Sequence, residues 1–162
     1  MVTGIVRRVD ELGRVVIPKE LRRTLGIREG EEIEVTPTEG RGLLLKKFSA
    51  IDELNGIKQE LLDAVYSATG MAAALTDAEK VVAAAGKGAP KIGTKLSDSG
   101  IAALEGRKPS DIPDDAFDNF VFAARGTLCP IFDFAVSGGV FVFGENAKVA
   151  AKIVAEFIKN RI

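Results

Sequence analysis

The sequence predicts an α+β protein of two domains, a small one at residues 1–50 and a larger one at residues 51–162. Charge is spread unevenly along the chain. Residues 4–28 carry seven cationic and three acidic side chains, a net +4, although the whole protein is −1. After residue 48 the chain becomes rich in Ala and Phe, as expected for a conventional packed core. A length of 162 residues accommodates two such domains.

The first domain begins with two short predicted strands. Ile5, Val6 and Val9 give the first strand its apolar character, and residues 15–17 form the second. Residues 10–13, Asp-Glu-Leu-Gly, supply turn chemistry between them, with a glycine that tolerates a positive φ. This hairpin carries several of the cations of the basic segment.

A helix and two further strands complete the first domain. Pro18 suits the start of a helix, Leu21 and Leu25 share one face, and Gly26 provides a left-handed cap. Residues 32–36 alternate with period two, and residues 43–48 form a last strand. The predicted order is therefore ββαββ. A unit of about fifty residues buries little surface alone, which favours pairing with a second copy.

The basic segment resembles a known family. TGIVRRVDELGRVVIPKELRRTLGIREG, followed by LLLKKF, is similar to the AbrB family of bacterial transition-state regulators, and the resemblance covers nearly all of residues 1–50. It implies a swapped-hairpin β-barrel dimer that binds double-stranded DNA as a transcriptional regulator of sporulation or transition-state genes. The layout of the whole chain resembles members in which a GAF-like domain follows this head.

The resemblance also implies which side chains contact DNA. The arginines of the G-I-V-R segment, of the turn and of the L-R-R-T helix match Arg7, Arg14, Arg22 and Arg23. Arg8 and Lys19 are two further candidates, at positions where the family carries basic residues or varies. The alternative is a solvated face on which these cations pair with nearby carboxylates: Asp10, Glu11 and Glu20.

Arginine suits this task because its planar fork donates two hydrogen bonds to a phosphate or a guanine edge. Few side chains in the segment can distinguish bases unambiguously. We therefore expect recognition weighted toward the DNA backbone and DNA shape, with a degenerate consensus sequence.

The second domain is predicted to contain helices around one sheet. The expected helices are residues 52–69, one within 96–105, and 147–162, and the expected strands are 71–76, 81–85, 120–124, 127–133 and 139–143. Asn146 is expected to cap the last helix, with its apolar stripe formed by Val149, Ile153, Val154, Phe157 and Ile158. This order is typical of GAF-like and PAS-like sensors, and periodicity does not distinguish the two.

No enzyme or cofactor site is predicted. The chain has no histidine, which rules out Ser-His-Asp and Cys-His arrangements and the usual zinc ligand sets. Cys129 is expected to be a buried packing residue, with redox sensing as the alternative. The aspartates near Pro113 suggest a solvated loop, and the glycine-rich residues 86–91 and 137–139 match no phosphate-binding motif. We expect no metal and no catalysis.

Partners and location follow from the same patterns. No stretch reaches the roughly 18 apolar residues of a membrane span, so we expect a soluble, cytoplasmic protein. The second domain either binds an unknown small molecule or drives assembly, to a dimer or a tetramer, and assembly is slightly favoured because no convergent polar cluster stands out. An antitoxin that pairs with a toxin is the alternative function, although residues 49–162 have the composition of a core rather than a disordered tail.

Overall fold

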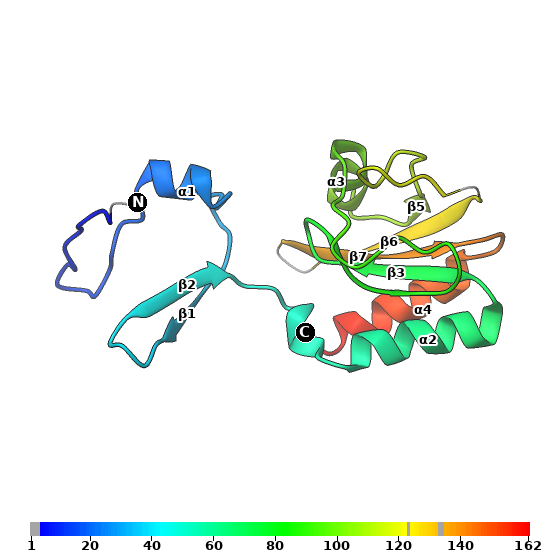
Figure 1. Ribbon diagram of the computed structural model, residues 1–162, viewed down its shortest axis with the longest axis horizontal. Helices are drawn as coiled ribbons and strands as arrows, with labels where there is room; N and C mark the ends of the chain where they lie inside the picture. The colour runs from blue at the N-terminus through cyan, green and yellow to red at the C-terminus, as the bar shows by residue number, and fades with distance from the viewer. Residues whose placement is uncertain (1–3, 123, 133–134) are drawn as a thin grey trace. The chain divides into compact units, whose positions relative to one another are not determined.

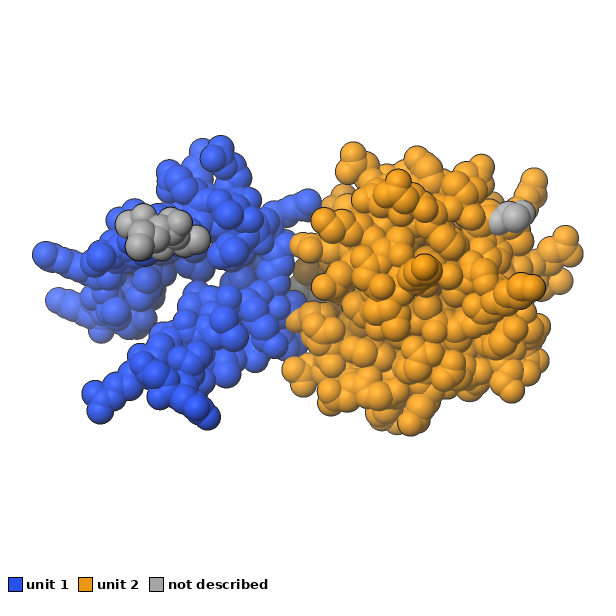
Figure 2. All heavy atoms as spheres, in the orientation of Figure 1, with its two compact units in different colours: residues 1–48 blue, residues 49–162 orange. Residues whose placement is uncertain are grey.

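The computed structural model describes residues 4–122, 124–132 and 135–162. The chain divides into two compact units, residues 1–48 and residues 49–162, coloured blue and orange in Figure 2. We refer to them as the head and the body. Each is built from helices and antiparallel strands, which confirms the α+β class.

The head contains one helix and one hairpin. Helix α1 (Lys19–Thr24) starts directly after Pro18, and the chain leaves it through Gly26 at φ 63°, so the predicted proline start and glycine cap are confirmed. Strands β1 (Ile33–Pro37) and β2 (Leu43–Lys47) pair antiparallel, with Ile33 opposite Lys47 (Figure 1). The last two predicted strands of the head are therefore confirmed.

The first two predicted strands are wrong for the single chain. Residues 4–18 contain no assigned strand, although the predicted turn does form. The Asp10 amide donates to the carbonyl of Arg14 at 3.1 Å, and the Gly13 amide donates to the carbonyl of Asp10 at 3.0 Å. A strand needs a neighbour to accept its hydrogen bonds, and beyond this turn the two arms make no ladder with each other.

The body is organised around a five-stranded antiparallel sheet. Its order is β4-β3-β7-β6-β5, formed by β3 (Ala72–Thr76), β4 (Val81–Ala85), β5 (Ser110–Asp111), β6 (Gly126–Phe132) and β7 (Val136–Phe143). Helices α2 (Ile57–Thr69) and α4 (Lys148–Lys159) cover one face, and α3 (Asp98–Glu105) lies on the other (Figure 1). Gly70 ends α2 at φ 71°, as predicted.

Side chains on the two faces of the sheet pack into two separate hydrophobic cores. Along β3, Ala73 and Leu75 face the α2 and α4 side, and Ala72 and Ala74 face the α3 side, which is the period-two alternation of a strand buried on both faces. The α3 side is aromatic. There the Phe141 ring lies 4.8 Å from the Phe117 ring, measured between centroids.

Two local predictions for the body differ from the structure at helix ends. The expected helix at 52–69 is divided into a short 3-10 helix, η1 (Asp52–Leu54), and α2, because Asn55 has φ 43° and ψ −129° and interrupts the helix. Asn146 does not cap α4. It has φ 61°, Ala147 is the N-cap residue, and no side chain caps this helix.

The strand pattern and the α4 stripe also need correction. Residues 120–122 and 124 are not in a strand, and residue 123 lies outside the described residues. The two-residue β5 was not expected. On α4, Val154 and Ile158 enter the core with Ala151 and Ala155, whereas Val149 and Ile153 are 67% and 63% exposed. Alanines thus form part of the face of α4 that packs on the sheet, and the residues at 149 and 153 lie on the solvent side of the helix.

Candidate nucleic-acid interface

The structure places the six predicted contact residues on two local elements of the head. Arg7, Arg8 and Arg14 lie on the arms of the Asp10–Gly13 turn, and Lys19, Arg22 and Arg23 lie on α1. We call these six residues the basic set. Five are exposed, and Arg22 is half-buried, with its Nε atom buried and without a hydrogen-bond partner.

The helix presents three of these cations together. Lys19 is separated by three and four residues from Arg22 and Arg23, so the three side chains lie on adjoining positions of the α1 surface. Arg22 and Arg23 also lie in the last turn, where the negative end of the helix dipole favours cations. The opposite side of the helix carries Leu21, whose carbonyl accepts from the Leu25 amide at 2.9 Å.

The turn is held by one carboxylate. Oδ1 of Asp10 accepts from the amides of Leu12 at 3.0 Å and Arg14 at 2.8 Å, and Oδ2 accepts from Nε of Arg14 at 2.7 Å. The Arg14 amide, followed by its guanidinium, lowers the pKa of Asp10. Gly13 has φ 78°, the left-handed conformation expected for it. Asp10 thus fixes both the turn and the Arg14 side chain.

The alternative of a surface fully neutralised by acidic neighbours is supported at one position only. Within the described residues, Arg14 is the one member of the basic set that pairs with a carboxylate. Glu11 and Glu20, the other two proposed partners, are exposed and form no ion pair with the set. Most of the positive charge of the basic set is therefore available to a ligand.

Charge on the β1–β2 hairpin is arranged differently. Lys46 pairs with Glu34 at 2.8 Å, and Lys47 pairs with Glu31 at 3.5 Å. Hydrogen bonds from Lys46 and then from Thr36 lower the pKa of Glu34. The hairpin is thus locally balanced, which leaves the turn and α1 as the cationic part of the head.

The apolar residues of the head are unusually exposed. Val16 is 74% exposed, and large apolar side chains with 42% exposure or more occur on the turn and its arms, at the end of α1 and on the hairpin: Ile5, Val6, Val9, Leu12, Val15, Leu25, Val35, Leu43, Leu44 and Leu45. An apolar surface of this extent typically marks a protein interface.

Outside the head, the candidate reactive groups are structural. Cys129 is buried in β6, and burial raises the pKa of its thiol, which opposes thiolate formation. Asp115 accepts a hydrogen bond from Ser99 at 2.7 Å in the loop beside α3. No cluster of potential metal ligands occurs among the described residues. None of the helices found in the described part of the chain is long and apolar enough to cross a membrane.

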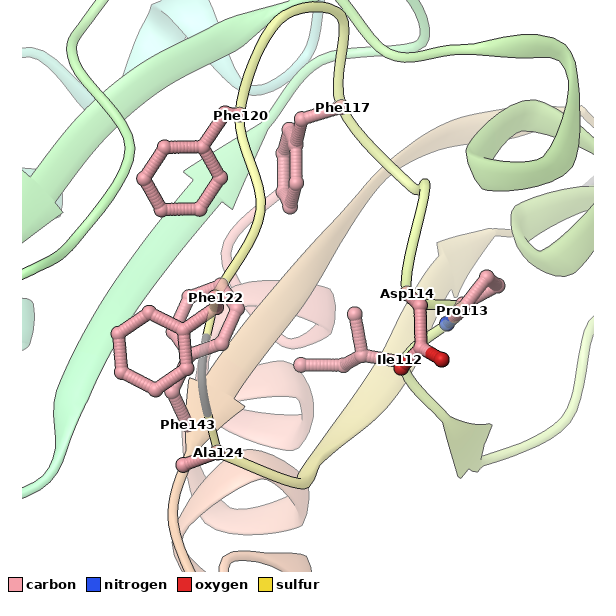
Figure 3. A pocket seen from close by; sticks show the side chains of 8 residues that line it. All are labelled: Ile112, Pro113, Asp114, Phe117, Phe120, Phe122, Ala124 and Phe143. Carbon is pink, nitrogen blue, oxygen red and sulfur yellow. The ribbon is translucent and has the colours of Figure 1, made fainter.

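A small aromatic hollow lies on the α3 side of the sheet in the body. Phe117, Phe120 and Phe122 from the loop after β5 surround it with Phe143 from β7, and Asp114 is the one charged residue of its lining (Figure 3). Its volume is about 10 Å³. That is room for one water molecule, so this hollow does not hold a metabolite as it stands. A second, more open hollow of about 520 Å³ is lined by residues of two loops: Ala89, Lys91, Gly93, Thr94, Lys95, Asp118, Asn119 and Phe120.

Known proteins match mainly the head. Residues 6–49 match the family described as "Antidote-toxin recognition MazE, bacterial antitoxin". Transition state regulatory protein AbrB of Bacillus subtilis (strain 168) is 61% identical over 46 residues, which are 28% of this chain and 47% of that protein. The resemblance of the head to the AbrB family is confirmed.

Two further relatives come from the same bacterium. Stage V sporulation protein T is 48% identical over 84 residues, which are 52% of this chain and 47% of that protein. Putative transition state regulator Abh is 51% identical over 45 residues, 28% of this chain and 48% of that protein. The chain thus spans about half the length of these relatives. The match to Stage V sporulation protein T is 84 residues long, whereas the head comprises residues 1–48. This match therefore includes residues of the body.

Proposed function

We propose that this protein is a DNA-binding transcriptional regulator whose head contacts duplex DNA through the basic set. The observation that carries the proposal is the unneutralised positive charge on the turn and α1 of an AbrB-like head. The relatives include a sporulation protein and a transition state regulatory protein, which suggests that the regulated genes belong to that physiological class. A protein that acts on chromosomal DNA in a bacterium works in the cytoplasm.

The head is proposed to act as a dimer. Its exposed apolar residues on the turn arms and the hairpin would be covered by the same residues of a second copy, as in the swapped-hairpin β-barrel of the AbrB family. The arms, which lack a strand partner within one chain, would then pair across the dimer. This arrangement brings two copies of the basic set into one surface.

Salt dependence and single arginine variants test the DNA proposal together. On a mixed-sequence duplex of about 30 base pairs, we expect log Kd to rise with log salt with a slope of about 5, because about six phosphates would be neutralised. Arg14→Ala and Arg23→Ala should each weaken binding by about ten- to a hundredfold at 0.1 M salt, since each change removes two cations per dimer. Fluorescence anisotropy of the full chain measures both.

Lys46→Ala is the matched control, because Lys46 is a head cation that already pairs with Glu34. We expect its affinity to stay within about threefold of the parent protein. A salt slope near zero, or equal losses for Lys46→Ala and Arg23→Ala, would show that the basic set does not form the DNA surface.

The body is proposed to be a GAF-like domain that drives assembly rather than ligand sensing. Val149 and Ile153 project from the outer face of α4, while Ile57 and Tyr66 on α2 are also substantially exposed. Pairing of these helices with a second body would cover them and join two head dimers into a tetramer. The aromatic hollow, by contrast, has no room for a metabolite as it stands, and the larger hollow beside it is open to solvent.

Ile153→Asp tests the assembly role. We expect the mass of the full chain, measured by light scattering, to fall by half, because the change places a charge in an apolar interface. Lys152→Asp is the control, since it changes charge at the neighbouring exposed position without removing apolar surface. An unchanged mass, together with a rise in melting temperature caused by a nucleotide or an amino acid, would instead favour a sensor.

The antitoxin alternative has one specific observation in its favour, the match of residues 6–49 to the MazE family. That match covers the head, which both classes of protein share. The body is a folded sheet with cores on two faces, unlike the disordered tail typical of a toxin-binding segment. Co-purification of the tagged chain with a growth-inhibiting protein would favour the antitoxin function.

A further inference from the structure

Arg14 differs from the rest of the basic set in pairing with a carboxylate. Its Nε donates to Oδ2 of Asp10 at 2.7 Å, while the Arg14 side chain as a whole remains 73% exposed. A guanidinium has two edges that can donate paired hydrogen bonds. Because Asp10 engages the edge at Nε, the two terminal nitrogens are left to face a ligand.

We propose that Asp10 is a positioning residue that orients Arg14 for a bidentate contact with the O6 and N7 atoms of a guanine, and thereby determines sequence specificity. This inference rests on the proposed function. A bidentate contact requires the plane of the guanidinium to lie in the plane of the base, so an arginine held in one orientation reads guanine better than a mobile one.

The other members of the basic set fit a different role. Arg8, Lys19 and Arg23 have no carboxylate partner among the described residues. Arg7 contacts the carbonyl of its neighbour Val6 at 3.3 Å. Mobile cations suit phosphate oxygens, which can be approached from many directions and carry no sequence information. Arg14 is therefore the base-reading candidate, and Arg7, Arg8, Lys19 and Arg23 supply affinity.

The charge of Asp10 makes this inference testable. A carboxylate near DNA repels every duplex equally, so its removal should strengthen non-specific binding. If Asp10 also orients Arg14, the same removal should weaken preference for the correct sequence. Affinity and specificity then change in opposite directions, which a purely structural role of Asp10 in the turn would not produce.

The experiment uses the full chain and two duplexes. The first is enriched by the parent protein from a random library, and the second has the same base composition in shuffled order. For the parent protein we expect a measurable ratio of the two Kd values. In Asp10→Asn, whose amide oxygen can still accept the Leu12 and Arg14 amides, we expect this ratio to fall about tenfold while binding to the shuffled duplex is equal or tighter.

Glu11→Gln is the matched control. Glu11 is the next acidic residue of the same turn and does not contact Arg14. Its neutralisation should strengthen binding to both duplexes to the same extent and leave the ratio of the two Kd values unchanged. Circular dichroism and light scattering verify that all variants keep the parent fold and mass.

Substituting 7-deazaguanine in the enriched duplex gives an independent measure. Loss of the N7 acceptor should weaken DNA binding by the parent protein about tenfold. It should weaken binding by Asp10→Asn much less, since that variant no longer makes the bidentate contact. Equal sensitivity of both proteins, or an unchanged Kd ratio in Asp10→Asn, would overturn the role of Asp10. A parent protein that binds neither duplex would instead refute the proposed function itself.

Discussion

Val16→Asp is expected to halve the mass of the assembly and to weaken DNA binding at least about a hundredfold. Val16 is 74% exposed on an arm of the turn and belongs to the apolar surface proposed to pair two heads. A carboxylate buried there would have no partner, and burial of an unpaired charge costs several kcal/mol. Because one head presents one of the two copies of the basic set, loss of the dimer removes half of the phosphate contacts. Light scattering and fluorescence anisotropy of the full chain measure the two effects.

Val16→Lys separates this effect from simple repulsion between Asp and phosphate. The lysine adds a positive charge, so it should strengthen DNA binding if the head remained paired. We expect it to dissociate the head and lose affinity like the aspartate variant, whereas Val16→Ala should keep most of the binding. Tighter DNA binding by Val16→Lys at unchanged mass would contradict the dimer proposed for the head.

The head shows where sequence patterns suffice and where they do not. Helix α1 and strands β1 and β2 depend on local signals, a proline start, a glycine cap and a hairpin whose two strands lie close in sequence. The expected strands at residues 5–9 and 15–17 have equally good composition. Their partners, however, are not supplied by one chain, and a strand is defined by its hydrogen-bonding partner.

In the body, long-range packing decided the features that sequence reasoning missed. The apolar runs of β3, β4, β6 and β7 were recognisable because each is buried on both faces or alternates. The two residues of β5 are too few to show periodicity. On α4, alanines rather than larger residues form part of the core face. Hydrophobicity alone ranked Val149 and Ile153 above them, so the predicted stripe is right at Val154, Phe157 and Ile158 and wrong at those two positions.

Sequence reasoning likewise predicted part of the candidate site and missed part of it. Resemblance identified the six cations, and charge counting showed that they are concentrated in one segment. The pairing of Arg14 with Asp10 is visible only in the structure, because the spacing of an Asp and an Arg across a turn does not determine whether their side chains meet. The spacing D-x-x-G-R is the signal that could have suggested it, since the glycine permits the turn that brings both side chains together.

Phe141→Ala is expected to lower the free energy of unfolding of the body by about 3–5 kcal/mol, the usual cost of truncating a buried phenylalanine. Phe141 is fully buried on β7 and packs against Phe117, at 4.8 Å between ring centroids. Removal of the ring leaves a cavity beneath the loop that carries Phe117 and Phe120. The rings of these two residues pack edge to face, with centroids 5.8 Å apart. Both β7 and that loop lose packing.

Urea unfolding followed by tyrosine fluorescence measures this effect in the body alone. The chain has no tryptophan and one tyrosine, Tyr66, which lies on α2. Phe141→Leu should cost less, because it keeps most of the side-chain volume, and Val149→Ala on the exposed face of α4 should change stability by less than about 0.5 kcal/mol. If Phe141→Ala and Val149→Ala unfolded at the same midpoint urea concentration, the aromatic cluster would not stabilise the α3 side of the sheet.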